Sequence, residues 1–162
     1  MAIDKAGLHQ AILAELESIN QAAAEAAIQA YNDATAKENV AENKYDTLGL
    51  EAGYLAQGQA QRAAELETNI RIYQKLPITT FEANMPIAVG ALVEIVDEQD
   101  IEQIVFLGPT AGGVKLTYAG KSIVIITPSA PLGQALMGQN LDDEIHINVG
   151  GQEKSYEITA LL

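Results

Sequence analysis

The chain has 162 residues, a formal net charge of −13 and no cysteine. Hydrophobic residues make up 48% of it, which is enough for a packed core and argues against a disordered chain. The missing cysteines exclude disulfides and cysteine-based metal or redox sites. The acidic balance argues against independent DNA binding, because phosphate binding needs a basic surface, and it favours docking on a basic patch of another protein.

The amino terminus and the apolar runs predict no association with a membrane. Met1–Lys5 lacks the basic region and the apolar core of a signal peptide. No apolar run approaches the about 18 residues that a membrane-spanning helix needs. We therefore expect a cytoplasmic protein, with which the absence of cysteine is consistent.

Two long helical patterns fill the chain from Asp4 to Leu76. Apolar and small residues recur in both at steps of four and three, which is typical of helices that wrap around each other as a coiled coil. The seam positions are Ile12, Leu16, Ile19, Ala23, Ala26 and Ala30 in the first pattern and Leu48, Ala52, Leu55, Ala63, Leu66, Ile70 and Tyr73 in the second. Because only a short polar joint, 37–43, separates two patterns of roughly 33 residues, they predict an antiparallel hairpin about 50 Å long.

The predicted tip of the hairpin lies at and just beyond this joint, and it carries the carboxylates Glu38, Glu42 and Asp46. A long hairpin with acids at its end suits a probe that reaches into a partner. The same acids also fit an ordinary solvated turn, and the residues by themselves favour that interpretation. Gly49 and Gly53 lie one helical turn apart, and they indicate either close approach of another surface or a bendable segment.

Pro77 ends the second helical pattern, and residues 77–86 read as a linker. Beyond the linker the period changes to two, and glycine-rich turns separate short apolar segments. The expected strands are 89–96, 104–107, 114–118, 123–126, 145–149 and 156–160, with one short helix over 131–138. These patterns predict an α+β protein with a helical hairpin in 1–76 and, in 87–162, a small domain built on an antiparallel sheet.

The segment Ser129-Ala130-Pro131-Leu132-Gly133-Gln134-Ala135-Leu136-Met137-Gly138 resembles a motif of the GreA/GreB transcript-cleavage factors of bacterial RNA polymerase. The family reads Ser-Pro-(Ile/Leu)-(Ala/Gly)-Arg-Ala-Leu-(Ile/Leu)-Gly, so Ala130 is inserted here and Gln134 replaces an arginine. The tip segment Asn39-Val40-Ala41-Glu42-Asn43 aligns without gaps with the family's Asp-Leu-x-Glu-Asn. The resemblance covers nearly the whole chain and indicates a divergent member.

The resemblance implies an FKBP-like carboxy-terminal domain that docks near the rim of the polymerase secondary channel, and a hairpin whose tip enters that channel. It implies that the tip carboxylates Glu38 and Glu42 act in the polymerase active site. Glu42 would hold a transient Mg²⁺ shared with the polymerase, since magnesium prefers oxygen ligands. The free protein would carry no cofactor.

The same resemblance predicts an accessory factor rather than an enzyme, with RNA polymerase as its partner. The residues expected to contact that partner are Asn39 and Asn43 at the tip and Ser129, Pro131 and Leu132 in the sheet domain. We expect no independent DNA binding, and a monomer or a weak dimer.

Asn39 stands where members that stimulate cleavage carry the first of two acidic residues, and its neutral amide cannot replace a carboxylate on a metal. Either Glu38 takes that role, or the protein occupies the channel as a regulator without stimulating cleavage. Two other classes remain open. A prolyl isomerase fits the FKBP-like domain, although only Phe81 and Phe106 and no tryptophan are available for an aromatic pocket. A coiled-coil scaffold would self-associate through the hairpin.

Overall fold

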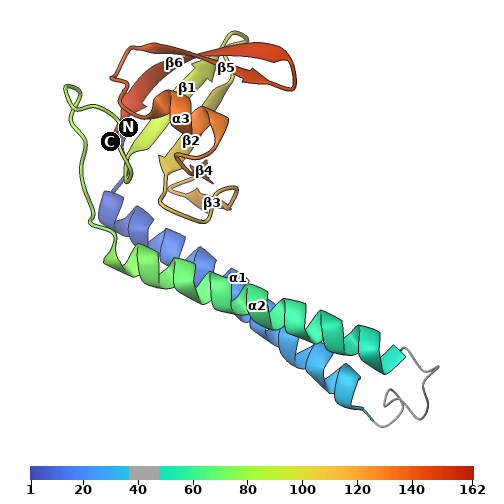
Figure 1. Cartoon of the computed structure of the whole chain (residues 1–162). Helices are drawn as coiled ribbons and strands as arrows, with labels where there is room; N and C mark the ends of the chain where they lie inside the picture. Colours follow the sequence, from blue (N-terminus) through green and yellow to red (C-terminus); the bar gives the residue numbers. More distant parts are fainter. Residues whose placement is uncertain (37–47) are drawn as a thin grey trace. The chain divides into compact units, whose positions relative to one another are not determined.

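The structure is a computed structural model of the chain, and it describes residues 1–36 and 48–162 (Figure 1). Its helices are α1 (Lys5–Thr35), α2 (Leu48–Lys75) and α3 (Pro131–Leu136). Its strands are β1 (Leu92–Asp97), β2 (Glu102–Leu107), β3 (Lys115–Tyr118), β4 (Lys121–Ile126), β5 (Glu144–Val149) and β6 (Gln152–Leu161). In the described part of the chain, no helix has the length and apolar character needed to cross a membrane.

The chain divides into two compact units. The hairpin unit is Leu13–Arg71, and the sheet unit combines Met1–Ile12 with Ile72–Leu162. The beginning of α1 and the end of α2 therefore belong to the sheet unit, although both helices run mainly through the hairpin unit.

In the hairpin unit, α1 and α2 lie alongside each other, as the seam predicts (Figure 1). Leu16, Leu66 and Ile70 are buried, and towards the tip the buried seam residues are Ala23 and Ala30. Large side chains thus pack one half of the seam and small ones the other. The predicted antiparallel hairpin is confirmed.

Two predicted seam positions are wrong. Ala26 is exposed, and the side chain of Leu55 is 57% exposed. The half-buried neighbours Ala27 and Ala56 take their places. Counting back from the buried Leu66 in steps of three and four reaches Ala56 rather than Leu55, so the register set by the large side chains decides which small residues face inward.

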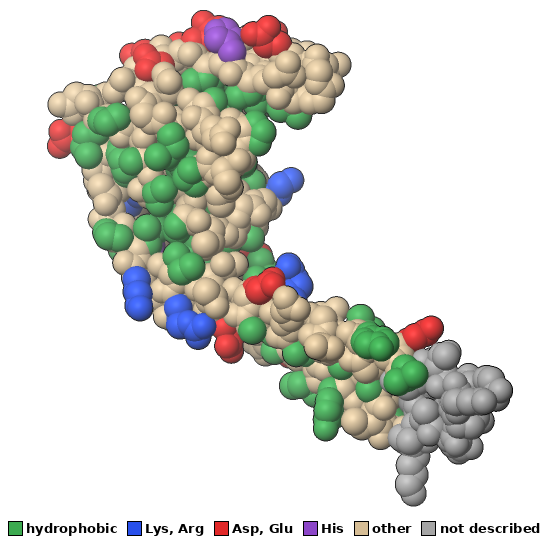
Figure 2. Space-filling model, viewed as in Figure 1, with side chains coloured by type: hydrophobic (Ala, Val, Ile, Leu, Met, Phe, Trp, Pro, Cys, Tyr) green, Lys and Arg blue, Asp and Glu red, His purple; other side chains and the backbone are tan. Residues whose placement is uncertain are grey.

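Near the tip, the small seam leaves large hydrophobic side chains on the outside of the hairpin (Figure 2). Those more than half exposed in the hairpin unit are Ile28, Tyr31, Leu50, Tyr54 and Leu55. A Cβ added at Gly53 or Gly58 would meet no other atom within 4 Å. At these two glycines, the described part of the chain itself makes no close approach.

The sheet unit is built on six strands in the order β3-β4-β2-β1-β6-β5. All neighbouring pairs are antiparallel, as predicted, except β2 and β4, which are parallel. The chain reverses after β2 into the edge strand β3 and returns through the tight turn at Ala119-Gly120, where φ is 52° and 75°. Because β4 then lies between β3 and β2, it must run in the direction of β2.

The main core of the sheet unit lies on the face of the sheet that α3 covers. Its members are buried apolar residues of the strands, of α3 and of the segment before β1: Phe81, Ile87, Ala91, Val93, Ile95, Val105, Leu107, Leu136, Ile145 and Ile158. The first strand was expected to begin at residue 89, but it begins at Leu92. Gly90 has a φ of 98°, and the amide of Ala91 donates to the carbonyl of Ala88, so a turn occupies this position.

Lys5, in the first turn of α1, is a buried cation of the sheet unit. Its Nζ donates to the carbonyl oxygens of Gly90 at 2.5 Å and Leu162 at 2.8 Å. It also lies 5.4 Å from the ring centroid of Phe81 and 5.8 Å from that of Phe106. Desolvation by burial lowers the pKa of Lys5 to about 8.

Tyr73, in the last turns of α2, is fully buried in the same unit. Its hydroxyl donates to the carbonyl oxygen of Thr110 at 2.7 Å, and its ring lies 6.4 Å from that of Phe106. Burial raises the pKa of the Tyr73 phenol, so the hydroxyl keeps its proton. Gly108 lies so close to this hydroxyl that a side chain there would collide with it.

We expect Lys5 to make stability depend on pH in a defined window. The pKa of Lys5 is about 8 in the fold and 10.5 in an unfolded chain, so folding releases a proton between these values. The destabilising contribution of the buried charge is fully present below pH 8 and is relieved as the pH rises towards 10.5. The unfolding free energy of the wild type should therefore rise relative to that of Lys5→Met by up to about 3 kcal/mol across this window.

Denaturant titrations at several pH values measure this difference. Lys154→Met removes an exposed lysine and should show no such trend. A difference between wild type and Lys5→Met that stays constant from neutral to alkaline pH would contradict the assignment.

Candidate partner-binding site

The predicted tip residues Glu38, Asn39, Glu42 and Asn43 lie outside the described residues. The described chain leads up to them through α1, which ends at Thr35, and resumes in α2 at Leu48. The expected Mg²⁺ ligand Glu42 is therefore not placed. Among the residues that are described, no group of three or more histidines and carboxylates could hold a metal ion.

The loop from β4 into α3 contains the other predicted contact residues. The Thr127 and Ser129 hydroxyl oxygens lie 2.9 Å apart in hydrogen-bonding contact, and the amide of Ala130 donates to the carbonyl of Thr127 at 3.1 Å. Pro131 then begins the helix, where its fixed φ and missing N–H suit the first turn. The loop is thereby held in one shape, with Ser129 and Pro131 exposed next to each other in the chain.

Leu132 differs from these two residues because it is half-buried and packs against the core of the sheet unit. Only part of its side chain is available to a partner. Gln134 and the 37% exposed Met137 instead continue the exposed surface at steps of three from Pro131. We call Ser129, Pro131, Gln134 and Met137 the α3 strip. Gln134 and Met137 were not predicted as contact residues, although their three-residue spacing from Pro131 is present in the sequence.

Gly133 sets the position of α3. It is buried, and a Cβ at this residue would run into the carbonyl group of Thr127. At the other end of the helix, Gly138 has a φ of 80° and its amide donates to the carbonyl of Ile87 at 2.8 Å. Close approach at one end and a backbone hydrogen bond at the other therefore fix the α3 strip on the sheet unit.

An open acidic hollow of about 330 Å³ lies on the sheet unit. Its acidic lining residues are Asp97, Glu98, Asp100, Asp142, Glu144 and Glu157. Asp97 accepts hydrogen bonds from the amides of Gln99 and Ile101, so its carboxylate shapes the turn between β1 and β2. We call this surface the acidic hollow; it presents negative charge suited to a basic partner surface.

His146, on the edge strand β5, lies beside Glu144 and Ser155, which both line this hollow. Its Nδ1 lies 2.7 Å from the Ser155 hydroxyl, and its ring nitrogens lie 3.9 Å and 4.0 Å from the carboxylates of Glu144 and Glu153. All of these groups are largely exposed, so they contribute little to stability.

Most of the sheet unit matches a known protein family in sequence. Residues 83–162 match the family model described as Transcription elongation factor, GreA/GreB, C-term. The match spans α3 and every strand, and it includes the α3 strip.

The relatives extend the similarity into the helices, and the chain belongs to the GreA/GreB family of transcription elongation factors. It is 30% identical over 133 residues to transcription elongation factor GreA of Beijerinckia indica, covering 81% of this chain and 78% of that protein. It is 24% identical over 165 residues to GreA of Polaromonas naphthalenivorans, covering 100% and 97% of the two chains. The crystal structure of GreA factor homolog 1 of Thermus thermophilus aligns over 93% of this chain and 94% of its own, with 18% identity and a TM-score of 0.39.

Gly133→Ala should destabilise the sheet unit, because the added methyl group has no space beside the Thr127 carbonyl. We expect a loss of about 1–3 kcal/mol in unfolding free energy, typical of overpacking. Thermal or denaturant unfolding measures it. Gln134→Ala, at the exposed neighbouring position, should stay within about 0.5 kcal/mol of the wild type; equal stability of the two variants would contradict the close packing of α3.

Proposed function

We propose that this protein is a transcription elongation factor that binds bacterial RNA polymerase and inserts the tip of its hairpin into the secondary channel. Membership of the GreA/GreB family is the observation that carries the proposal. The long paired helices support it: α1 has 31 residues and α2 has 28. At about 1.5 Å per residue, they extend over roughly 42–47 Å, long enough to carry the residues between them deep into a channel.

The tip supplies the chemistry in this proposal. Glu38 and Glu42 offer carboxylate oxygens, and Asn39 offers a neutral amide oxygen. Such hard oxygen donors fit Mg²⁺, although so few ligands would need the polymerase to complete the coordination shell. When bound, the ion would stabilise negative charge on the RNA phosphodiester. Glu42 would be the ligand from this chain, and Glu38 would orient the attacking water.

The sheet unit would dock on the polymerase through the α3 strip and the acidic hollow. The strip offers exposed apolar and polar groups on a fixed backbone, and the hollow offers charge for a basic surface. This chain would act as an accessory factor on the polymerase active site. An isomerase is a poorer interpretation, because Phe81 and Phe106 are both buried and lie beside Lys5.

Asn39 supports a second candidate within the same class. With one carboxylate fewer at the family's acidic positions, the tip would occupy the channel and regulate the polymerase without stimulating RNA cleavage. The two candidates share the binding mode and differ only in whether Glu38 compensates for Asn39.

Glu42→Gln should reduce cleavage of backtracked RNA by about tenfold or more, because it removes a charged oxygen ligand while keeping the shape of the side chain. The assay follows shortening of labelled RNA in stalled elongation complexes. Glu51→Gln makes the same charge change at an exposed position in the first turn of α2, and it should retain activity. If the wild type binds and slows elongation without cleaving RNA, the regulatory candidate replaces the cleavage factor.

Pro131→Glu should weaken binding to RNA polymerase by about tenfold, because it places a charge within the α3 strip. Glutamate is compatible with the first turn of a helix, so the fold should be retained. Co-purification and competition binding measure the effect, with Gln152→Glu on the exposed start of β6 as the control. Failure of the wild-type protein to bind the polymerase at micromolar concentration would remove the proposed function altogether.

A further inference from the structure

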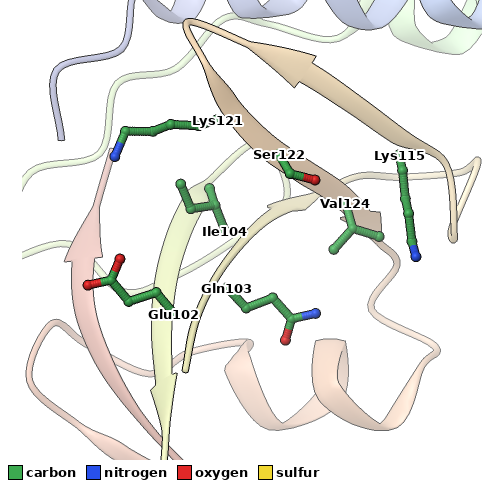
Figure 3. Close-up of a pocket in the computed structure, with 7 residues that line it drawn as sticks. All are labelled: Glu102, Gln103, Ile104, Lys115, Lys121, Ser122 and Val124. Atoms are coloured by element: carbon green, nitrogen blue, oxygen red, sulfur yellow. The ribbon is translucent and has the colours of Figure 1, made fainter. Parts of the chain in front are cut away.

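The sheet unit has a second open hollow, which we call the lysine hollow, where β2, β4 and β3 are neighbours (Figure 3). It has a volume of about 360 Å³ and is lined by Glu102, Gln103, Ile104, Lys115, Lys121, Ser122 and Val124. Ile104 is buried and Val124 half-buried, whereas the other five side chains are exposed and polar. None of these residues belongs to the tip, the α3 strip or the acidic hollow.

The lysine hollow concentrates positive charge in an acidic domain. Residues 77–162 contain eleven acidic residues and only three basic ones, Lys115, Lys121 and Lys154. Two of the three lysines line this one hollow, at opposite ends of it (Figure 3). Neither lysine of the hollow forms a salt bridge with a carboxylate of the described residues.

The sheet holds both lysines in place. Lys121 follows the tight turn at Ala119-Gly120 and pairs with Tyr118, and Lys115 lies opposite Val124 in the register of β3 and β4. Lysine on an edge strand such as β3 is a common protection against unwanted strand pairing. Lys121 lies instead on the inner strand β4, two residues before the pairing of β4 with β2 begins at Ile123.

We propose that the lysine hollow docks an extended segment of another protein that is rich in glutamate or aspartate. An acidic segment is repelled by the remaining surface of this domain, so the lysines determine where it approaches. The Gln103 amide and the Ser122 hydroxyl supply hydrogen-bonding groups for its backbone. The hollow is too open to bury most of a small molecule, which favours a polypeptide that lies across it.

Substituting Glu102 should change the affinity for an acidic segment in the opposite direction to substituting a lysine. Its carboxylate also lines the lysine hollow and forms no ion pair among the described residues. It would oppose an acidic segment that the two lysines attract. Removing a lysine and removing this glutamate should therefore change the affinity in opposite directions. The proposal requires no polymerase and stands apart from the proposed function.

The experiment measures binding of the full chain to a short fluorescent peptide of alternating glutamate and serine, by anisotropy at low ionic strength. Lys115→Gln and Lys121→Gln should each weaken binding by about two- to fivefold, and the double variant by about tenfold, as expected for exposed ion pairs. Glu102→Gln should tighten it by about two- to fivefold. Resonance shifts on peptide addition should centre on β3 and β4.

Two controls carry the same changes in net charge outside the lysine hollow. Lys154→Gln and Glu82→Gln change exposed residues that line neither hollow, and both should leave the affinity nearly unchanged. Equal effects of Lys154→Gln and Lys115→Gln would overturn the proposal, because attraction would then be non-specific. It is also overturned if the wild type does not bind the peptide at millimolar concentration, or if inorganic phosphate at the same concentration displaces it fully.

Discussion

The sheet unit depends on two buried side chains that the ends of the long helices supply. Lys5 at the start of α1 and Tyr73 near the end of α2 are both buried there. A buried ammonium group is costly unless polar groups or rings compensate it. Lys5 is compensated by hydrogen bonds to the carbonyls of Gly90 and Leu162 and by two phenylalanine rings. Tyr73 donates a hydrogen bond to the Thr110 carbonyl. Hydrogen bonds to backbone carbonyls therefore hold the first turn of α1 and the last turns of α2 within the sheet unit.

Within the hairpin unit, packing weakens towards the tip. Leu16, Leu66 and Ile70 bury large side chains, each worth about 1.5–3 kcal/mol, whereas Ala30 buries a single methyl group. Near the tip, Tyr54 is 73% exposed and adds little to the seam. The stabilising contacts are thus concentrated away from the tip, and local opening requires least free energy where the helices approach residues 37–47. In the proposed function, this is the part that enters the partner.

The sequence predicted the elements well because large side chains and turn residues leave strong periodic signals. Leu16 and Leu66 placed the seam, and Pro131 placed the start of α3. The prediction of inward-facing residues was wrong at Ala26 and Leu55, because a helix rich in alanine and glycine offers several small residues that could occupy each inward position. Large buried residues farther along the helix, such as Leu66, then decide which small residues face inward, and counting over a few residues does not include them.

Long-range contacts were beyond sequence reasoning. Nothing in the sequence around Lys5 indicates its burial, because its two carbonyl acceptors lie 85 and 157 positions away in the chain. The parallel pairing of β2 and β4 likewise depends on how the chain turns between them. At the candidate site, Ser129 and Pro131 are exposed, whereas Leu132 is half-buried because it packs against the core. Their contact with a partner stays a prediction.

The charge of the sheet unit changes sign over a short distance, and this affects which partners it can accept. Asp100 belongs to the acidic hollow, and Glu102, two residues later, lines the lysine hollow. The net charge of −13 repels acidic partners, but Lys115 and Lys121 place two positive charges at one hollow. A basic surface would be attracted to the acidic hollow and repelled by the two lysines, and an acidic segment would experience the reverse. Each hollow thus disfavours the partner of the other, so specificity here comes from repulsion as much as from attraction.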